Sequence, residues 1–172
     1  MTRTPWAEYE RAVRVYTEAG AAETVQRIVT AISRLSRRLD VFYRDRYEAL
    51  DIVPHEWPVL HALALEGRNG VSNPSRLAAA AGVPASTMTH RLDRMVARGL
   101  IKRAPDPENR TRMAVSLTQA GWELFRAAVL DAEPEETDVF APLTDDERAT
   151  LAALLEKALA GEEQPARRRR PV

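Results

Sequence analysis

The helix predicted over residues 85–98 carries a polar face whose side chains suit contacts to nucleic acid. The face combines short donors and acceptors with an imidazole and a guanidinium: Ser86, Thr87, Thr89, His90 and Arg94. Such groups match base edges and phosphate oxygens. The other face is apolar and should pack on the domain, because four residues recur there at helical spacing: Met88, Leu92, Met95 and Val96. An ordinary solvated helix has the same pattern, so the neighbouring segments decide between the two interpretations.

A basic β-hairpin is predicted directly after this helix. The first strand begins at residue 100, and the second is indicated by apolar residues that alternate with polar or small ones: Met113, Val115 and Leu117. Turn-forming residues fill 105–109, and cations surround them: Lys102, Arg103, Arg110 and Arg112. Seven basic and three acidic residues give segment 91–112 a net charge of +4. We expect Arg110 and Arg112 to reach DNA phosphates or the minor groove.

A short helix and a tight turn precede the polar helix. Residues 75–81 suit a helix, Gly82 suits the turn, and Ser72 or Asn73 can cap the first helix at its N-terminus. The order helix, turn, helix and hairpin describes a winged helix-turn-helix, whose second helix lies in a DNA major groove. The whole chain is predicted to be mainly α, with a small β-hairpin as the wing.

Long amphipathic helices flank this unit. Residues 5–20 form one helix with an aromatic stripe, and residues 22–50 form a longer one whose apolar seam repeats every three or four residues. A third helix follows Thr118, and an acidic, Pro-containing connection at 133–138 separates it from a fourth. Thr144 and Glu147 form a capping box that opens the fourth helix, whose leucines are predicted to be buried: Leu151, Leu154, Leu155 and Leu159.

The flanking helices require partners, which are either other helices of the same chain or a second subunit. The predicted organisation is N-terminal dimerisation helices over 1–50, the winged helix-turn-helix over 51–121, C-terminal dimerisation helices over 122–163 and a disordered basic tail over 164–172. Formal net charge is zero, but segment 131–163 holds eleven acidic and two basic residues, a net −9. The charges of the basic and acidic segments therefore cancel in the formal net charge, while each segment keeps its own electrostatic field.

The composition argues against catalysis and membrane insertion. The chain lacks cysteine, which excludes disulfides and thiolate metal sites. Its three histidines, His55, His61 and His90, are dispersed, and we interpret His61 as a hydrogen-bonded core residue. No catalytic motif is visible, so neither an enzyme, a metal nor a cofactor is expected. The sequence has no apolar run of about 20 residues and no signal peptide, from which we expect a cytoplasmic protein.

The chain resembles the MarR family of bacterial winged helix-turn-helix transcriptional regulators. The resemblance rests on Leu77-Ala78, the run from Ser86 to Arg94, Gly99-Leu100-Ile101 and the run from Leu117 to Gly121. It implies a homodimer with interdigitated terminal helices that binds a palindromic operator as a repressor. It also implies an Arg of the wing in the minor groove, which matches Arg110. Asn109 stands where the family usually has the preceding Asp.

The resemblance further implies a small anionic or aromatic effector, bound between the dimer helices and the winged domain. A urate- or aconitate-responsive branch is similar in its extra N-terminal helix, and its ligand-binding Trp and two Arg match Trp6, Arg91 and Arg103. Pro58 stands where that branch has an Asp. Arg side chains bind carboxylates bidentately, and salt bridges or phosphate contacts are the alternative roles of Arg91 and Arg103.

The most specific prediction is a DNA-binding transcriptional regulator that acts as a homodimer and is released by an effector. Two alternatives remain open. Winged helices also bind proteins, and the acidic segment 131–163 would suit a protein-interaction module. An enzyme with a winged dimerisation domain is the other alternative, although 172 residues leave no room for a separate catalytic domain.

Overall fold

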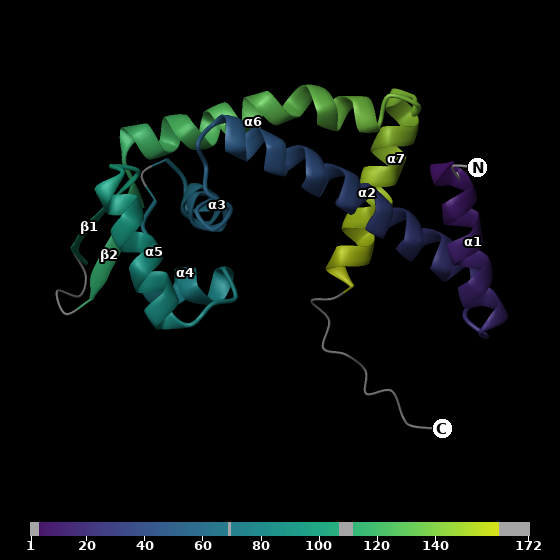
Figure 1. The fold of residues 1–172 in the computed structure, drawn as a ribbon, viewed down its shortest axis with the longest axis horizontal. Coiled ribbons are helices and arrows are strands. Elements are labelled where there is room, and N and C mark those ends of the chain that lie inside the picture. Colours follow the sequence, from purple (N-terminus) through teal and green to yellow (C-terminus); the bar gives the residue numbers. More distant parts are fainter. Residues whose placement is uncertain (1–3, 69, 107–111, 162–172) are drawn as a thin grey trace. The chain divides into compact units, whose positions relative to one another are not determined.

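The computed structural model describes residues 4–68, 70–106 and 112–161 (Figure 1). Within these ranges the chain forms seven α-helices and two β-strands, which confirms the predicted fold class. It divides into two compact units, Met1–Glu133 and Pro134–Val172. None of the described helices is both long and apolar enough to cross a bilayer.

Two N-terminal helices pack on one another. The Thr4 side chain caps α1 (Pro5–Glu18) by accepting from the Ala7 N–H at 3.2 Å. On α2 (Glu23–Ala49), the Arg27 carbonyl accepts from the Tyr9 hydroxyl at 3.1 Å. Val13 of α1 is buried, whereas no residue of α2 is. The predicted apolar seam of α2 lies on the surface of the single chain, with 37–54% exposure at Val25, Ile28, Ile32 and Leu35.

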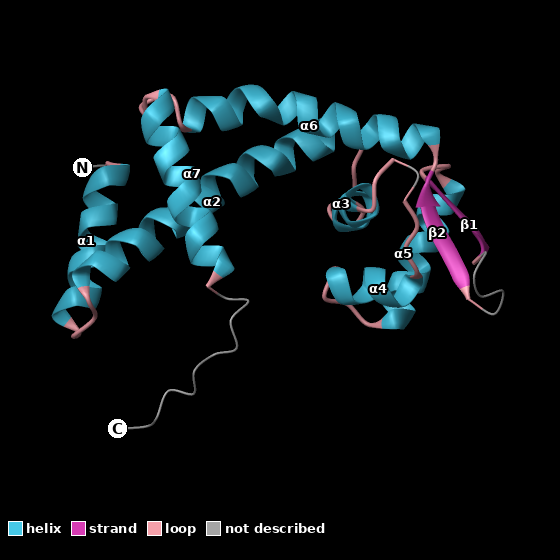
Figure 2. Ribbon diagram, turned by 180° about the vertical axis from the view of Figure 1, so that it is seen from behind, coloured by secondary structure: helices cyan, strands magenta, loops and turns pink. Residues whose placement is uncertain are grey.

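The hydrophobic core lies in the winged domain, which comprises α3 (Trp57–Leu65), α4 (Pro74–Ala80), α5 (Ala85–Ala97) and the two strands. Figure 2 shows the strands beside α5. Each helix contributes apolar side chains that are fully or almost fully buried: Val59, Leu60 and Leu63, then Leu77, then Met88, Leu92 and Met95. The Asn73 side chain caps α4 as predicted, accepting from the Arg76 N–H at 2.9 Å. Val96, expected on the packed face of α5, is 41% exposed.

The wing is an antiparallel hairpin of β1 (Ile101–Pro105) and β2 (Met113–Leu117). Ile101 pairs with Leu117 near the core, and Pro105 pairs with Met113 at the outer end. Val115 and Leu117 are buried as predicted, but Met113 is 44% exposed, because its end of the hairpin extends beyond the core. Mutual backbone hydrogen bonds of 2.9 Å between Ser72 and Val115 fasten the hairpin to the segment before α4.

Helix α6 (Gln119–Val139) continues through Pro134, where we expected a connection over 133–138. A proline removes one helix hydrogen bond and usually breaks a helix. Here Ala128 and Ala132 before it and Val139 after it are buried, so burial of one face favours the continuous helix. Thr118 starts α6 as predicted: its hydroxyl accepts from the Gly121 N–H at 3.0 Å and donates to the Gly99 carbonyl at 2.6 Å.

The second unit contains α7 (Asp145–Ala160), which begins with the predicted capping box. The Thr144 N–H donates to the Glu147 carboxylate at 2.8 Å, and the Thr144 hydroxyl accepts from the Glu147 N–H at 3.3 Å. The hydrogen bonds from Thr144 lower the pKa of the Glu147 carboxyl. The prediction that the leucines of α7 are buried is wrong for the single chain, since Leu154 and Leu159 are 60% and 64% exposed.

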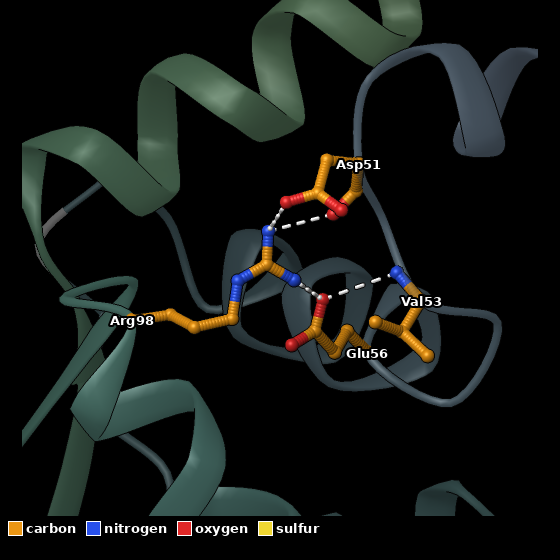
Figure 3. Close-up of polar contacts among 4 residues, drawn as sticks. All are labelled: Asp51, Val53, Glu56 and Arg98. Atoms are coloured by element: carbon orange, nitrogen blue, oxygen red, sulfur yellow. Dashed lines mark hydrogen bonds and ion pairs between the residues drawn. The ribbon is translucent and has the colours of Figure 1, made fainter.

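A buried ion pair joins the segment between α2 and α3 to the end of α5 (Figure 3). Glu56 is 1% exposed, and its carboxylate accepts from Arg98 at 2.5 Å and from the Val53 N–H at 3.2 Å. Arg98 also donates to the Asp51 carbonyl at 2.6 Å and to the Asp51 carboxylate at 2.8 Å. Asp51 is held at a φ of 54°. The C-terminal end of α5 is therefore fixed by side chains that lie far from it in sequence.

We expect Arg98→Ala to lower the free energy of unfolding by about 2 kcal/mol, because it leaves a buried carboxylate without its partner. The estimate is below the value for a fully buried pair, since Arg98 itself is 29% exposed. Asp51→Asn should cost less than about 1 kcal/mol, because the Asp51 side chain is 91% exposed. Urea unfolding followed by circular dichroism measures both, and equal effects would contradict this assignment.

Candidate nucleic-acid interface

The polar face predicted on α5 is exposed in the structure. Ser86, Thr89, His90 and Arg94 are exposed and Thr87 is half-buried, whereas the intervening Met88 and Leu92 are fully buried. The Thr89 hydroxyl donates to the Ala85 carbonyl of its own helix at 3.0 Å. Gly99, at a φ of 72°, ends the helix as predicted. Core and polar positions therefore alternate along α5, and the polar side chains form a continuous row of donors and acceptors that faces solvent.

An open hollow of about 250 Å³ lies against this face. Four of its lining residues come from α5 and the fifth from the segment before α3: Thr87, His90, Arg91, Arg94 and His55. Neither arginine forms an ion pair with a residue that the structure describes, so both guanidinium groups are available to an outside acceptor. The sequence grouped Arg91 with ligand-binding residues, and the structure instead places it beside the predicted DNA contacts.

Arg103 lies on the other side of α5 from this hollow. Its guanidinium donates to the Asp93 carboxylate at 2.6 Å and to the Thr89 carbonyl at 3.2 Å. Thr89 and Asp93 are each two residues from Arg91, which corresponds to about 200° around the helix. The buried Nε of Arg103 has no hydrogen-bond partner within the described part of the chain. Arg91 and Arg103 are thus not brought together, and Arg103 connects β1 of the wing to α5.

Trp6 is 63% exposed on α1 and its ring is tilted against that of Tyr9, with 5.1 Å between ring centroids. The contacts of α1 reach residues 27 and 34 of α2, whereas the aromatic contact of α2 with α3 is made by Tyr47. Residues 34 and 47 are separated by about 20 Å of helix. One chain therefore does not assemble Trp6, Arg91 and Arg103 into one pocket.

Of the two wing arginines predicted to contact DNA, the structure describes Arg112. Arg112 is exposed beside the hairpin end, where its carbonyl accepts from the Asp106 N–H at 2.9 Å. Arg110 and Asn109, like the predicted tail 164–172, lie outside the described residues. Arg112 and the exposed face of α5 form the described part of a winged helix surface that the sequence assigned to DNA.

The remaining histidine differs from its prediction. His61 is exposed rather than a core residue, and its ring lies 6.1 Å from Trp57 and 6.5 Å from Phe125 at the edge of an aromatic cluster. Among the described residues there is no group of three or more His, Cys, Asp or Glu side chains that suits a metal ion. The polar surface of α5 therefore stands as the main candidate site in the described ranges.

Sequence reasoning missed two features of this site. His55 was left among the dispersed histidines, although it lines the hollow with four residues of α5. Glu56 was given no role, although it binds Arg98. The position of Glu56 directly before an apolar helix could have indicated an ion pair, since a carboxylate at a buried position is almost always paired. His55 had no sequence signal, because its neighbours come together only on folding.

Comparison with known proteins finds a family model and several relatives that are similar to this chain. The model described as the MarR family matches residues 50–110. The HTH-type transcriptional regulator PecS of Dickeya dadantii is 27% identical over 128 residues, which cover 74% of this chain and 77% of that protein. An HTH-type transcriptional regulator from Mycobacterium tuberculosis is 35% identical over 100 residues, which cover 58% of this chain and 61% of that protein.

Solved structures agree with these sequence relatives. Apo MarR from Escherichia coli is 27% identical, with a TM-score of 0.63 over 75% of this chain and 93% of that chain. A variant of the same protein complexed with operator DNA is also 27% identical, with a TM-score of 0.58 over 75% of this chain and 91% of that chain. Regulator Tm0710 from Thermotoga maritima, at 22% identity and a TM-score of 0.63, shares the fold.

The Arg103–Asp93 pair generates a prediction that separates a connecting role from a ligand-binding role. If Arg103 holds the wing on α5, Arg103→Ala and Asp93→Ala should each lower stability, and the double variant should cost less than their sum. We expect a coupling of about 0.5–1 kcal/mol, because Asp93 is 55% exposed. Thermal unfolding of the four proteins gives this value. Strictly additive effects of the two substitutions on stability would contradict a connecting role of Arg103.

Proposed function

We propose that the chain is a winged helix-turn-helix transcriptional regulator of the MarR family and that it recognises a specific operator sequence in double-stranded DNA. The observation that carries the proposal is the exposed polar face of α5, with Ser86, Thr89, His90 and Arg94 free of the core. The related Escherichia coli protein has been solved in complex with operator DNA. We place α5 in the major groove, where these side chains meet base edges.

The wing supplies the second part of the proposed interface. Arg112 is exposed at the hairpin, and Arg110 follows from the family resemblance, so both are assigned to phosphates or the minor groove. The Asp93–Arg103 ion pair supports this arrangement, because it sets the direction of the hairpin relative to α5. Base contacts on α5 provide specificity, and the cations of the wing provide orientation.

We propose that the chain acts as a homodimer. Its first dimerisation segment is 1–50, its second is 122–163, and the winged domain lies over 51–121. Support comes from exposed apolar side chains along α1, α2 and α7, which a single chain leaves in contact with water. A two-fold dimer would present two copies of α5 to half-sites about 34 Å apart, which favours a palindromic operator.

Repression is the proposed mode of action, because an operator-bound dimer blocks access to the promoter. An effector of small anionic or aromatic character would release the DNA by binding one dimer state more tightly than the other. Trp6, Arg91 and Arg103 remain the candidate ligand residues. Since one chain keeps them apart, their common site would require the partner subunit or a different chain conformation. The expected location of such a regulator is the cytoplasm.

The DNA-binding proposal is tested by fluorescence anisotropy with two duplexes. One carries the sequence upstream of the protein's own gene, and the other is a scrambled duplex of the same composition. Arg94→Ala should weaken binding to the native duplex about tenfold or more, since one base or phosphate contact of Arg is worth about 1–3 kcal/mol. Arg14→Ala on α1 removes the same charge far from α5 and should have little effect. Equal, weak binding of the unaltered protein to both duplexes would favour a protein-interaction module.

The homodimer is tested by light scattering after size-exclusion chromatography. Ile28 is 54% exposed on α2 and contributes nothing to the core of the winged domain. Ile28→Glu should therefore convert the dimer to a monomer while the helical circular dichroism signal persists. Arg37→Glu, an exposed charge change on the same helix, serves as the control. A dimer that survives Ile28→Glu would contradict this choice of interface.

A further inference from the structure

We propose that His55 is a DNA-contact residue and that the hollow it forms with α5 holds a backbone phosphate of the duplex. The proposal rests on the proposed function and extends it to a residue outside the helix-turn-helix. His55 lies in the segment between α2 and α3, in the sequence some thirty residues before the other residues that line the hollow. The contact surface of the winged domain would thus include a second element beside α5.

The lining of the hollow suits an anion with several oxygen acceptors. The residues that line this space of about 250 Å³ carry two guanidinium groups, two imidazoles and one hydroxyl. Of the described residues that line it, none is acidic. One water molecule occupies about 30 Å³ of liquid, so the space accommodates a phosphate group together with bound water. Charge-assisted hydrogen bonds from arginine to phosphate are among the strongest in proteins.

The nearby carboxylates are directed to other partners. Glu56 follows His55 in sequence, but its carboxylate is buried against Arg98 and the Val53 N–H. Asp93 lies on α5, but its carboxylate accepts from Arg103 on the far side of the helix. Arg91 and Arg94 are therefore not neutralised by the described acids closest to them. A phosphate entering the hollow would meet uncompensated positive charge.

The segment that carries His55 is held in place before any ligand arrives. The Glu56 N–H donates to the Val53 carbonyl at 2.8 Å, and the Val53 N–H donates to the Glu56 carboxylate at 3.2 Å. These two bonds close a tight loop around His55, and Arg98 fastens that loop to the end of α5. A backbone segment that is already held in place loses little conformational freedom on binding. His55 lies beside α5 rather than on it. Because α5 itself would occupy the major groove, a side chain beside that helix would contact the phosphate backbone rather than base edges.

Two histidines in a phosphate site link DNA affinity to pH. Imidazole gains a positive charge within the range of about pH 5 to 8, and a bound phosphate favours the charged form. The residues that line the hollow with His55 are Thr87, His90, Arg91 and Arg94 of α5, while Glu56 of its own segment is paired with Arg98. Binding would therefore take up protons, and affinity should rise as pH falls from about 8 to 6.

The test measures anisotropy of native and scrambled duplexes with the full chain, over a salt series at pH 6 and pH 8. At pH 6, His55→Gln should weaken binding to both duplexes by a similar factor, because a phosphate contact carries no sequence information. The slope of log K against log salt should fall by about one. At pH 8 the same substitution should have a smaller effect. His61→Gln, which alters an exposed histidine outside the hollow, should change neither quantity.

His55→Lys supplies a second variant with a fixed charge. It should restore the salt slope at both pH values and reduce the dependence of affinity on pH, and thermal unfolding checks that each variant folds. If His55→Gln behaves like His61→Gln at pH 6, the proposal is overturned. The proposal is also overturned if His55→Gln leaves the affinity for the duplex unchanged and abolishes only the inhibition of DNA binding by inorganic phosphate at matched ionic strength. In that case the hollow binds free anions rather than the duplex. Failure of the unaltered protein to bind either duplex would instead count against the proposed function.

Discussion

The ion pair between Glu56 and Arg98 is the interaction on which the arrangement of the winged domain depends. Glu56 is 1% exposed among apolar residues, where a carboxylate is tolerated only when it is paired and hydrogen-bonded. Its partner lies at the C-cap of α5, so the carboxylate can be buried only when that end of the helix lies beside the segment before α3. Desolvation offsets much of the attraction in such pairs. The pair therefore acts mainly by specifying where α5 ends.

The same pairing shapes the charge of the candidate interface. Glu56 is bound to Arg98 and Asp93 to Arg103, so both of these acids are compensated within the protein. Their neighbours Arg91 and Arg94 have no described ionic partner. The formal net charge of zero consequently says little about this surface, because the acidic residues concentrate in segment 131–163. Local compensation, rather than total charge, sets the field that a duplex would meet.

Periodicity and capping predicted the parts of the fold that are encoded locally. The helix with Met88 and Leu92 inside, the glycine that ends it and the capping box at Thr144 follow from neighbouring residues, and all three are present. The continuity of the helix through Pro134 and the exposure of Met113 depend on which residues the rest of the chain buries. A pattern of neighbouring residues does not predict that burial. For the site, the row of α5 residues was predicted, whereas the approach of His55 and the pairing of Arg103 arise only from the tertiary fold.

Helix α2 links the proposed dimer interface to the proposed DNA surface through few contacts. It has no buried residue, and at its C-terminal end Tyr47 stacks on Trp57, with ring centroids 4.7 Å apart. Just beyond that end, Asp51 accepts from Arg98 at the end of α5. A rotation of α2 at a subunit interface would thus act on α3 through the aromatic stack and on α5 through Arg98. Because packed cores transmit such shifts rather than absorb them, the spacing of two recognition helices would follow the orientation of α2.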